Sequence, residues 1–211
     1  MGHIGILGGT FNPVHLGHLF MGRAAAEAFG LDRVLLLPCS VSPFKIGAAG
    51  LAAGADRLEM VRLSVAGDPL FEPCGLDLER GGVSYAVDSV RALRERYPHD
   101  HFSFIIGGDA LRELGHWHKI DEMLTLCDVI TVERPGIDLP VDAMRLAFPE
   151  AVRERLLSRV IRGRLCDVSS TEIRRRIAEG RSIRYLVCPA VEAYIRDRRL
   201  YAANGEKEAD H

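Results

Sequence analysis

The chain has 211 residues, of which 47% are hydrophobic and 27% are charged, and its formal net charge at pH 7 is -2. These values are typical of a globular protein with one sizeable core, and they argue against general electrostatic binding to nucleic acid or to an anionic membrane. No apolar run approaches the ~18 residues of a membrane-spanning helix, and the N-terminus lacks a secretory pattern. Five dispersed cysteines without a C-x-x-C pair predict reduced thiols in a cytoplasmic protein.

The chain begins with a short apolar run followed by a glycine-rich turn, in the sequence MGHIGILGGTFNPVHLGH. Residues 4–7 predict a strand, and residues 16–29 predict a helix that ends at Gly30. The turn between them matches neither G-x-G-x-x-G nor G-x-x-x-x-G-K-[ST], the two commoner phosphate-binding loops.

Two glycines and two histidines in this turn point to an anion-binding site. Gly8 and Gly9 allow the backbone to approach a ligand closely, and the N–H groups at the following helix start favour an anion. His15 and His18 are three residues apart, so both could donate hydrogen bonds to one polyphosphate. The alternatives are a plain turn with solvated histidines and, less favoured because no third ligand lies nearby in sequence, a metal site.

The second predicted strand covers residues 34–37, an uninterrupted apolar run that suits a strand buried on both faces. Residues 47–55 are nearly all glycine and alanine and predict a mobile loop that closes over a substrate, although the alanines could permit some helix. A helix is expected over residues 57–66, and Ser84 is expected to cap the next helix. The following strand covers residues 102–106.

Two candidate ligand-binding residues follow this strand. Asp109 comes directly after Gly107 and Gly108, so its carboxylate could accept hydrogen bonds from a ribose or cap a helix, and the sequence favours neither. Trp117 is the only tryptophan and lies between two histidines. It could stack on a flat heterocycle or, as is commoner, anchor the core.

The C-terminal third continues the alternation of strands and helices. A strand over residues 127–132 ends just before Arg134, which is expected at the same edge of the sheet as the other motifs or as a surface arginine before a turn. Residues 160–168 predict the last strand, and helices are expected over residues 170–179 and 189–198.

The stretch SSTEIRRRI predicts a helix start, because Ser169 and Glu172 fit a capping box. Its hydroxyls, its free N–H groups and Arg174 also suit phosphate binding. On these residues alone, a well-capped surface helix with Ile173 and Ile177 packed inward is the better explanation.

The alternation predicts an α/β protein with a Rossmann-like, doubly wound, mainly parallel sheet and helices on both faces. Such sheets bind ligands beyond the carboxyl ends of the strands, where the strand order reverses. Residues 1–201 are expected to form a single domain, and the polar residues 202–211 are expected to form a disordered tail.

The motif GGTFNPVHLGH resembles the T/H-x-G-H signature of the nucleotidyltransferase superfamily. More narrowly, the chain up to about Tyr201 is similar to the bacterial nicotinate-mononucleotide adenylyltransferases: VSSTEIR resembles their I-S-S-T-x-x-R motif and GGD their G-x-D motif. The resemblance implies that a phosphate oxygen of nicotinate mononucleotide attacks the α-phosphorus of ATP. Pyrophosphate leaves, and the product is deamido-NAD, an intermediate of NAD biosynthesis.

The resemblance also implies three groups of site residues. The implied catalytic residues are His15, His18, Lys45 and Arg174. The implied ATP-binding residues are Gly8, Gly9, Thr10, Phe11, Gly107, Asp109, Ser170, Thr171 and Arg174. The implied mononucleotide-binding residues are Lys45, Ser84, Tyr85, Ala86, Trp117, His118 and Arg134.

Three residues depart from the family pattern. The family usually has P-P-H-[KR] where this chain reads SPFK, so Phe44 replaces a polar contact while Lys45 remains. Ala86 replaces a threonine whose hydroxyl helps bind the nicotinate carboxylate, which weakens the expected preference for the acid over the amide. Asn12 stands where relatives often have aspartate and removes one negative charge beside the phosphates.

The resemblance implies Mg²⁺ held mainly by ATP phosphates and water, so no dedicated metal ligands are expected from the protein. The expected partners are ATP and nicotinate mononucleotide, without nucleic acid or membrane, and a homo-oligomer is left open. Relatives that use nicotinamide mononucleotide, phosphopantetheine or glycerol phosphate supply alternative acceptors. A non-catalytic nucleotide sensor is the alternative of a different class, disfavoured because His15, His18, Lys45 and Arg174 are all retained.

Overall fold

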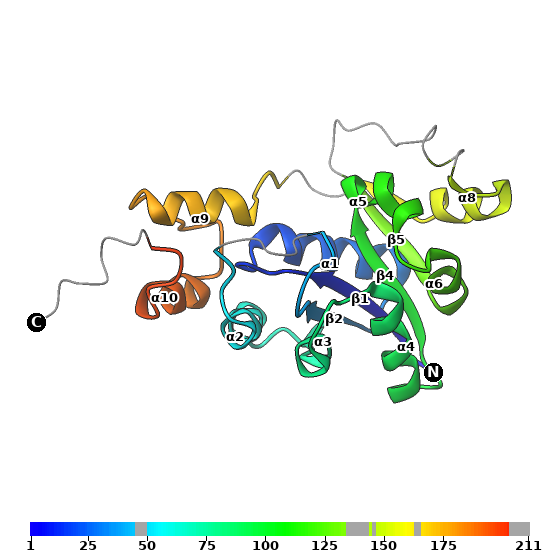
Figure 1. Ribbon diagram of the computed structural model, residues 1–211, viewed down its shortest axis with the longest axis horizontal. Helices are drawn as coiled ribbons and strands as arrows, with labels where there is room; N and C mark the ends of the chain where they lie inside the picture. Colours follow the sequence, from blue (N-terminus) through cyan, green and yellow to red (C-terminus); the bar gives the residue numbers. More distant parts are fainter. Residues whose placement is uncertain (45–49, 134–143, 145–146, 163–165, 203–211) are drawn as a thin grey trace, which may run out of the picture.

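The computed structural model describes residues 1–44, 50–133, 144, 147–162 and 166–202. Its centre is a six-stranded sheet with the order β3-β2-β1-β4-β5-β6, and all five strand pairings are parallel (Figure 1). The predicted doubly wound, parallel α/β fold is therefore confirmed. In the described part of the chain, no helix has the length and apolar character that crossing a membrane requires.

The strands are short and lie close to their predicted places. Their bounds are β1 His3–Gly9, β2 Arg33–Pro38, β3 Phe71–Pro73, β4 His101–Gly107, β5 Asp128–Glu133 and β6 Val160–Arg162. Strand β3 was not predicted, because three residues are too few to show an alternating pattern. The prediction of one strand over residues 160–168 was wrong, since β6 ends at Arg162 and residues 166–169 are not extended into the sheet.

The helices include several short ones that the sequence pattern did not reveal. Their bounds are α1 Leu16–Phe29, α2 Gly54–Ser64, α3 Leu76–Arg80, α4 Ala86–Arg96, α5 Gly108–Glu113, α6 Ile120–Leu126, α8 Glu150–Leu157, α9 Ser170–Ala178 and α10 Pro189–Asp197, with a 3₁₀ turn η1 at Leu114–His116. Helix α1 has its predicted bounds and ends at Gly30, whose φ of 62° is the left-handed conformation that glycine adopts readily.

Two local predictions need correction. Helix α2 begins at Gly54, so the last two residues of the predicted loop 47–55 are helical, as the alternative for its alanines allowed. Residues 45–49, and with them the predicted closing motion, lie outside the described residues. Ser84 does not cap α4, because Tyr85 occupies the N-cap position. The Ser84 hydroxyl instead accepts a hydrogen bond from the Ser40 N–H at 2.9 Å.

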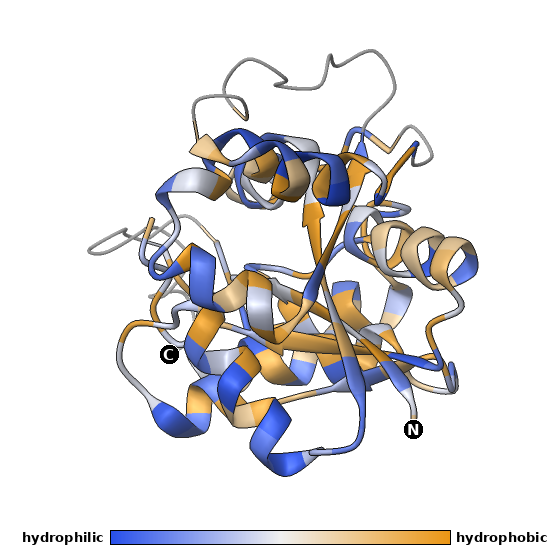
Figure 2. Ribbon diagram, turned by 90° about the vertical axis from the view of Figure 1, so that its right-hand side faces the viewer, coloured by the Kyte–Doolittle hydropathy of each residue, from blue (hydrophilic) through white to orange (hydrophobic). Residues whose placement is uncertain are grey.

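The sheet buries apolar side chains on both faces, as continuous apolar strands require. On one face, Ile4 and Ile6 of β1 pack in a cluster with residues of α4 and α6. On the other face, Leu7 packs in a second cluster with residues of α1, α2 and α10. Figure 2 shows the resulting arrangement, with apolar segments on the strands and polar segments on the outer sides of the helices.

The strand order places a crevice beside β1. This strand pairs with β2 on one side and with β4 on the other. From β1 the chain passes to α1 on one face of the sheet, and from β4 it passes to α5, which contributes to the cluster on the opposite face. Because the two connections diverge, the carboxyl ends of β1 and β4 form the type of crevice in which α/β proteins bind ligands.

The last described residues return to the loop after β1. Helices α9 and α10 lie together at one end of the molecule, with α10 against α2 (Figure 1). Tyr194 and Arg198 both donate hydrogen bonds to Oδ1 of Asp56, at 2.8 and 3.1 Å. The Tyr201 hydroxyl donates to Oδ1 of Asn12 at 2.7 Å, and burial raises the pKa of this hydroxyl well above that of a free tyrosine. The C-terminal segment is thus tied directly to the first loop.

We expect Tyr201→Phe to lower the free energy of unfolding by about 1 kcal/mol, because a buried acceptor on Asn12 loses one donor while the aromatic packing is kept. Denaturant unfolding of the two proteins measures this difference. Tyr185→Phe is the matched control, since Tyr185 is 78% exposed. Equal stability of the two variants would contradict the assigned role of the Tyr201 hydroxyl.

Candidate active site

The loop between β1 and α1 is folded tightly over its own phenylalanine. A Cβ atom on Gly8 would lie 3.0 Å from the Phe104 ring, and one on Gly9 would lie 3.3 Å from the Phe11 ring. A Cβ at either position would therefore press on an aromatic ring, which would have to shift by a few tenths of an ångström. Phe11 has a positive φ of 47° and is only 1% exposed, so a contact from Phe11 to ATP would have to come from its backbone.

The two histidines form one stacked unit at the start of α1. His15 is the N-cap residue, is 7% exposed, and donates its backbone N–H to Nδ1 of His18 at 3.2 Å. The two imidazole rings stack with their centroids 3.7 Å apart and an interplanar angle of 28°. The Phe11 ring meets His18 edge-on at 4.9 Å. These contacts hold both imidazoles at the positive end of a 14-residue helix.

The start of α9 lies against this same loop. The hydroxyl of Ser170 donates to the carbonyl oxygen of Pro13 at 2.9 Å, and the Arg174 guanidinium donates to the carbonyl oxygen of Asn12 at 2.8 Å. A Cβ on Gly17 would lie 3.7 Å from the carbonyl oxygen of Val168. Stretches more than 150 residues apart in sequence therefore form one surface.

The N-cap predicted for α9 is confirmed. Ser169 is the N-cap residue, and its hydroxyl accepts a hydrogen bond from the Glu172 N–H at 3.1 Å. Thr171 is exposed in the first turn, and its hydroxyl accepts a bond from Arg174 at 3.3 Å. Two helix N-termini, two imidazoles and one guanidinium thus meet at one place, which is an arrangement suited to binding a polyphosphate.

Asp109 lies at the end of the neighbouring strand β4. Gly107 is the N-cap residue of α5, so the alternative in which Asp109 caps that helix is wrong. Asp109 is exposed in the first helical turn. Its carboxylate is therefore accessible to a ligand at the crevice beside β1.

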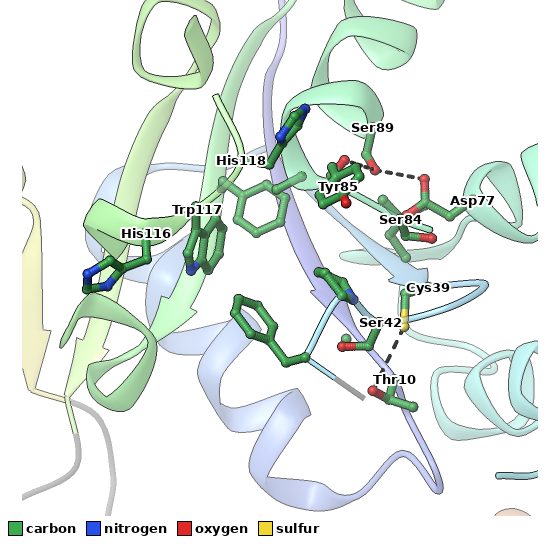
Figure 3. A pocket seen from close by; sticks show the side chains of 17 residues that line it. Thr10, Cys39, Ser42, Asp77, Ser84, Tyr85, Ser89, His116, Trp117 and His118 are labelled. Carbon is green, nitrogen blue, oxygen red and sulfur yellow. Dashed lines mark hydrogen bonds between the residues drawn. The ribbon is translucent and has the colours of Figure 1, made fainter. Parts of the chain in front are cut away.

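A cavity of about 430 Å³ opens beside the glycine loop (Figure 3). This size falls in the range of small-molecule sites, roughly 300–1,000 Å³. The cavity brings together most of the side chains expected to bind the mononucleotide. The lining residues on which the argument draws are Gly8, Gly9, Thr10, Cys39, Phe44, Asp77, Ser84, Tyr85, Ala86, Ser89, Phe104, His116, Trp117 and His118.

Aromatic rings form one wall of this cavity. Trp117 is half-buried and meets the Phe104 ring edge-on, with centroids 5.9 Å apart. Tyr85 and His118 pack with their ring centroids 4.3 Å apart. Trp117 therefore packs against the core and also lines the cavity, so anchoring the core does not prevent it from contacting a ligand. Phe44, at the cavity rim, is 66% exposed.

The start of α4, at which Tyr85 is the N-cap, and the segment before it also line the cavity. Ser84 is buried, and its N–H donates to the carbonyl oxygen of Val41 at 2.9 Å. The Ser89 hydroxyl donates to Oδ1 of Asp77 at 2.7 Å, as the dashed line in Figure 3 shows. Burial raises the pKa of the Asp77 carboxyl, while the bond from Ser89 and the charge of Arg80 lower it. The N-terminus of α4 supplies backbone N–H groups to this end of the cavity.

Five polar residues that line the cavity were not predicted as site residues, namely Cys39, Ser42, Asp77, Ser89 and His116. Cys39 follows strand β2 directly, so the rule that ligand sites lie beyond strand ends could have found it. Asp77 lies on a five-residue helix with no sequence signal of its own. Two predicted ligands, Lys45 and Arg134, lie outside the described residues.

Comparison with known proteins agrees with this geometry. The family model described as "Cytidylyltransferase-like" matches residues 6–176. A probable nicotinate-nucleotide adenylyltransferase of Pelobacter propionicus is 42% identical over 212 residues, which cover 94% of this chain and 98% of that protein. A protein of the same description from Synechococcus sp. (strain JA-3-3Ab) is 44% identical over 198 residues, which cover 94% of each chain.

Among solved structures, the nicotinic acid mononucleotide adenylyltransferase of Plasmodium falciparum, complexed with NaAD, has the same fold. Its TM-score is 0.72 at 17% identity, and the match covers 95% of this chain and 98% of that one. The sequence matches at about 40% identity over nearly the whole chain carry the family assignment. The chain therefore belongs to the cytidylyltransferase-like family and, within it, to the nicotinate-nucleotide adenylyltransferases.

Proposed function

We propose that this cleft transfers the AMP moiety of ATP to nicotinate mononucleotide, giving deamido-NAD and pyrophosphate in NAD biosynthesis. The observation that carries the proposal is the meeting of the α1 and α9 N-termini, with the stacked histidines and Arg174, beside an aromatic cavity. A polyphosphate suits the first part of this site, and a flat ring suits the second.

ATP occupies the side of the cleft formed by the two helix starts. His15 and His18 contact its phosphates, and Arg174 neutralises part of their charge. The hydroxyl and backbone groups of Ser170 and Thr171 add donors at the start of α9. The same side is lined by Gly8, Gly9, Thr10 and the backbone of Phe11. The ribose is bound by Gly107 and Asp109.

The mononucleotide occupies the aromatic cavity. Its pyridine ring stacks on Trp117, with Tyr85 and His118 beside it. Its carboxylate faces the N–H groups at the start of α4, around Ser84 and Ala86, where the helix end favours a negative charge. Ala86 offers no hydroxyl there, so backbone groups carry the recognition of the acid. Lys45 and Arg134 are the proposed partners of the mononucleotide phosphate.

The reaction needs no nucleophile from the protein, because the attacking oxygen belongs to the mononucleotide phosphate. Catalysis consists of holding the two phosphate chains in line and stabilising the negative charge that develops during transfer. His15 and His18 are directional donors fixed in place by their stacking and by the bond between the His15 N–H and His18. Arg174 is fixed by its bond to the Asn12 carbonyl.

Mg²⁺ is the proposed metal ion, and it would neutralise charge on the ATP phosphates. The residues present fit an ion that is held mainly by the nucleotide and water. Oδ1 of Asn12 already accepts hydrogen bonds from the Ala52 N–H at 3.0 Å and from the Tyr201 hydroxyl at 2.7 Å, so this side chain serves the protein rather than a metal.

Pyrophosphate release from ATP, measured separately with each candidate acceptor, tests the proposal. We expect release with nicotinate mononucleotide, and a smaller kcat/KM with nicotinamide mononucleotide because the start of α4 favours a carboxylate. Preference for the amide, or for phosphopantetheine or glycerol phosphate, would replace the proposed acceptor. Binding of ATP without pyrophosphate release with any acceptor would favour a nucleotide sensor.

We expect His18→Ala to lower turnover by ~10²-fold or more, which is the effect of removing one donor to the transition state. The fold should be unchanged, because His18 is only partly buried. Steady-state pyrophosphate release measures the effect, and His99→Ala is the control because His99 is an exposed histidine at the other end of the sheet, before β4. Near-normal turnover of the His18 variant would remove this residue from the catalytic group.

A further inference from the structure

One arginine is buried directly behind the glycine loop. Arg57 of α2 is 2% exposed and has the largest of the fully buried side chains among the described residues. Its guanidinium donates four hydrogen bonds, to the carbonyl oxygens of Thr10 at 2.8 Å, Cys39 at 2.7 Å, Ala52 at 3.1 Å and Ser40 at 3.3 Å. One side chain therefore binds the segments that follow β1 and β2 and also Ala52, which lies two residues before the start of α2.

The four bonds end on backbone carbonyl groups, although a carboxylate is next to Arg57 in the sequence. Asp56 faces the C-terminal segment instead, where it accepts bonds from Tyr194 and Arg198. Burial lowers the pKa of the Arg57 guanidinium, yet arginine keeps its charge at neutral pH. Among the residues that the structure describes, no carboxylate is hydrogen-bonded to Arg57. Its positive charge therefore lies behind the loop to which the proposed function assigns the ATP phosphates.

The bonds from Arg57 also set the direction of two peptide groups. In a trans peptide the C=O and the following N–H point in opposite directions. With the Thr10 carbonyl bound to Arg57, the N–H of Phe11 points away from the guanidinium. With the Cys39 carbonyl bound in the same way, the Ser40 N–H points toward Ser84, and it donates to that hydroxyl at 2.9 Å.

Arg57 therefore connects both halves of the cleft. Thr10 belongs to the ATP side, and Ser84, reached through the Cys39–Ser40 peptide, belongs to the wall of the mononucleotide cavity. A planar guanidinium with five fixed donors can hold two loops at once, whereas the single ammonium group of lysine cannot reproduce this fork.

We propose that Arg57 is a positioning residue for adenylyl transfer, which fixes the ATP-binding loop relative to the wall of the acceptor cavity. The inference rests on the proposed function, because it assigns the two loops to the two substrates. Arg57 contacts neither substrate itself. Its loss should therefore change the alignment of the reacting groups more than the affinity for either substrate, and misplacement of about 1 Å can lower a rate by ~10²-fold.

Arg57→Lys tests this role, because lysine keeps the positive charge but lacks the planar set of guanidinium N–H donors. We expect kcat to fall by about tenfold or more, with each KM changed by less than about threefold. The control is Arg62→Lys on the same helix, whose exposed side chain pairs with Glu59 at 3.4 Å and whose kcat should be unchanged. Both variants are assayed below their melting transitions, so that an unfolded fraction does not lower the apparent kcat.

A second variant separates positioning from a purely structural role. In Arg57→Ala, added guanidinium chloride at millimolar concentration should restore part of kcat, because the ion can occupy the vacated space and bind the same carbonyl groups. If the alanine variant does not fold, the kcat of the lysine variant alone tests the positioning role of Arg57.

Wild-type kcat in a folded Arg57→Lys variant would overturn the inference, as would a folded alanine variant that guanidinium does not rescue. The wild-type chain is measured in the same assay. Its inactivity with every acceptor would refute the proposed function and this inference together, whereas wild-type activity with an unaffected lysine variant would refute the inference alone.

Discussion

The whole cleft depends on two helix N-termini being held side by side. The Ser170 hydroxyl bound to Pro13 and the Arg174 guanidinium bound to Asn12 fix α9 against the loop that leads into α1. Both helix ends carry a partial positive charge, and Arg174 adds a full one, so bringing them together is unfavourable until an anion lies beside them. The fold supplies the means of holding them: the strand order reverses beside β1, and the C-terminal segment returns to Asn12 through Tyr201. Packing and hydrogen bonds therefore hold together a cluster of positive charge, which a polyphosphate stabilises under the proposed function.

Much of this arrangement could be predicted from the sequence where local chemistry is strong. The apolar runs predicted most strands of the sheet, and Gly30 predicted the end of α1 because helices commonly end at a glycine, which adopts the left-handed conformation readily. Ser169 was recognisable as an N-cap from its spacing to Glu172. The glycines and histidines of the first loop predicted an anion-binding site from local residues alone, and the structure places the two histidines in a stack at the start of α1. On the acceptor side, Trp117, Tyr85 and His118 were assigned through family resemblance, and the structure shows them lining one cavity.

The remaining features depend on tertiary contacts that no local pattern encodes. Strand β3 and helix α3 are too short for periodicity, so Asp77 could not be placed in the cavity. Ser84 resembled a helix cap, but its hydroxyl binds a backbone N–H from the segment after β2.

Arg57 had no sequence signal, since an arginine in a helical segment is usually exposed. Its burial is explained only by four carbonyl groups that three separate segments contribute. Asn12 likewise acquires its role from Ala52, Tyr201 and Arg174, each of which is distant in sequence.

A crystal structure of the chain with a non-hydrolysable ATP analogue and nicotinate mononucleotide would locate both substrates relative to the two helix N-termini. We expect the triphosphate to lie between the starts of α1 and α9, with its oxygens within hydrogen-bond distance of His18 and Arg174, and the pyridine ring to lie against Trp117. A triphosphate bound elsewhere, for example at the start of α4 with both imidazoles out of reach, would contradict this expectation.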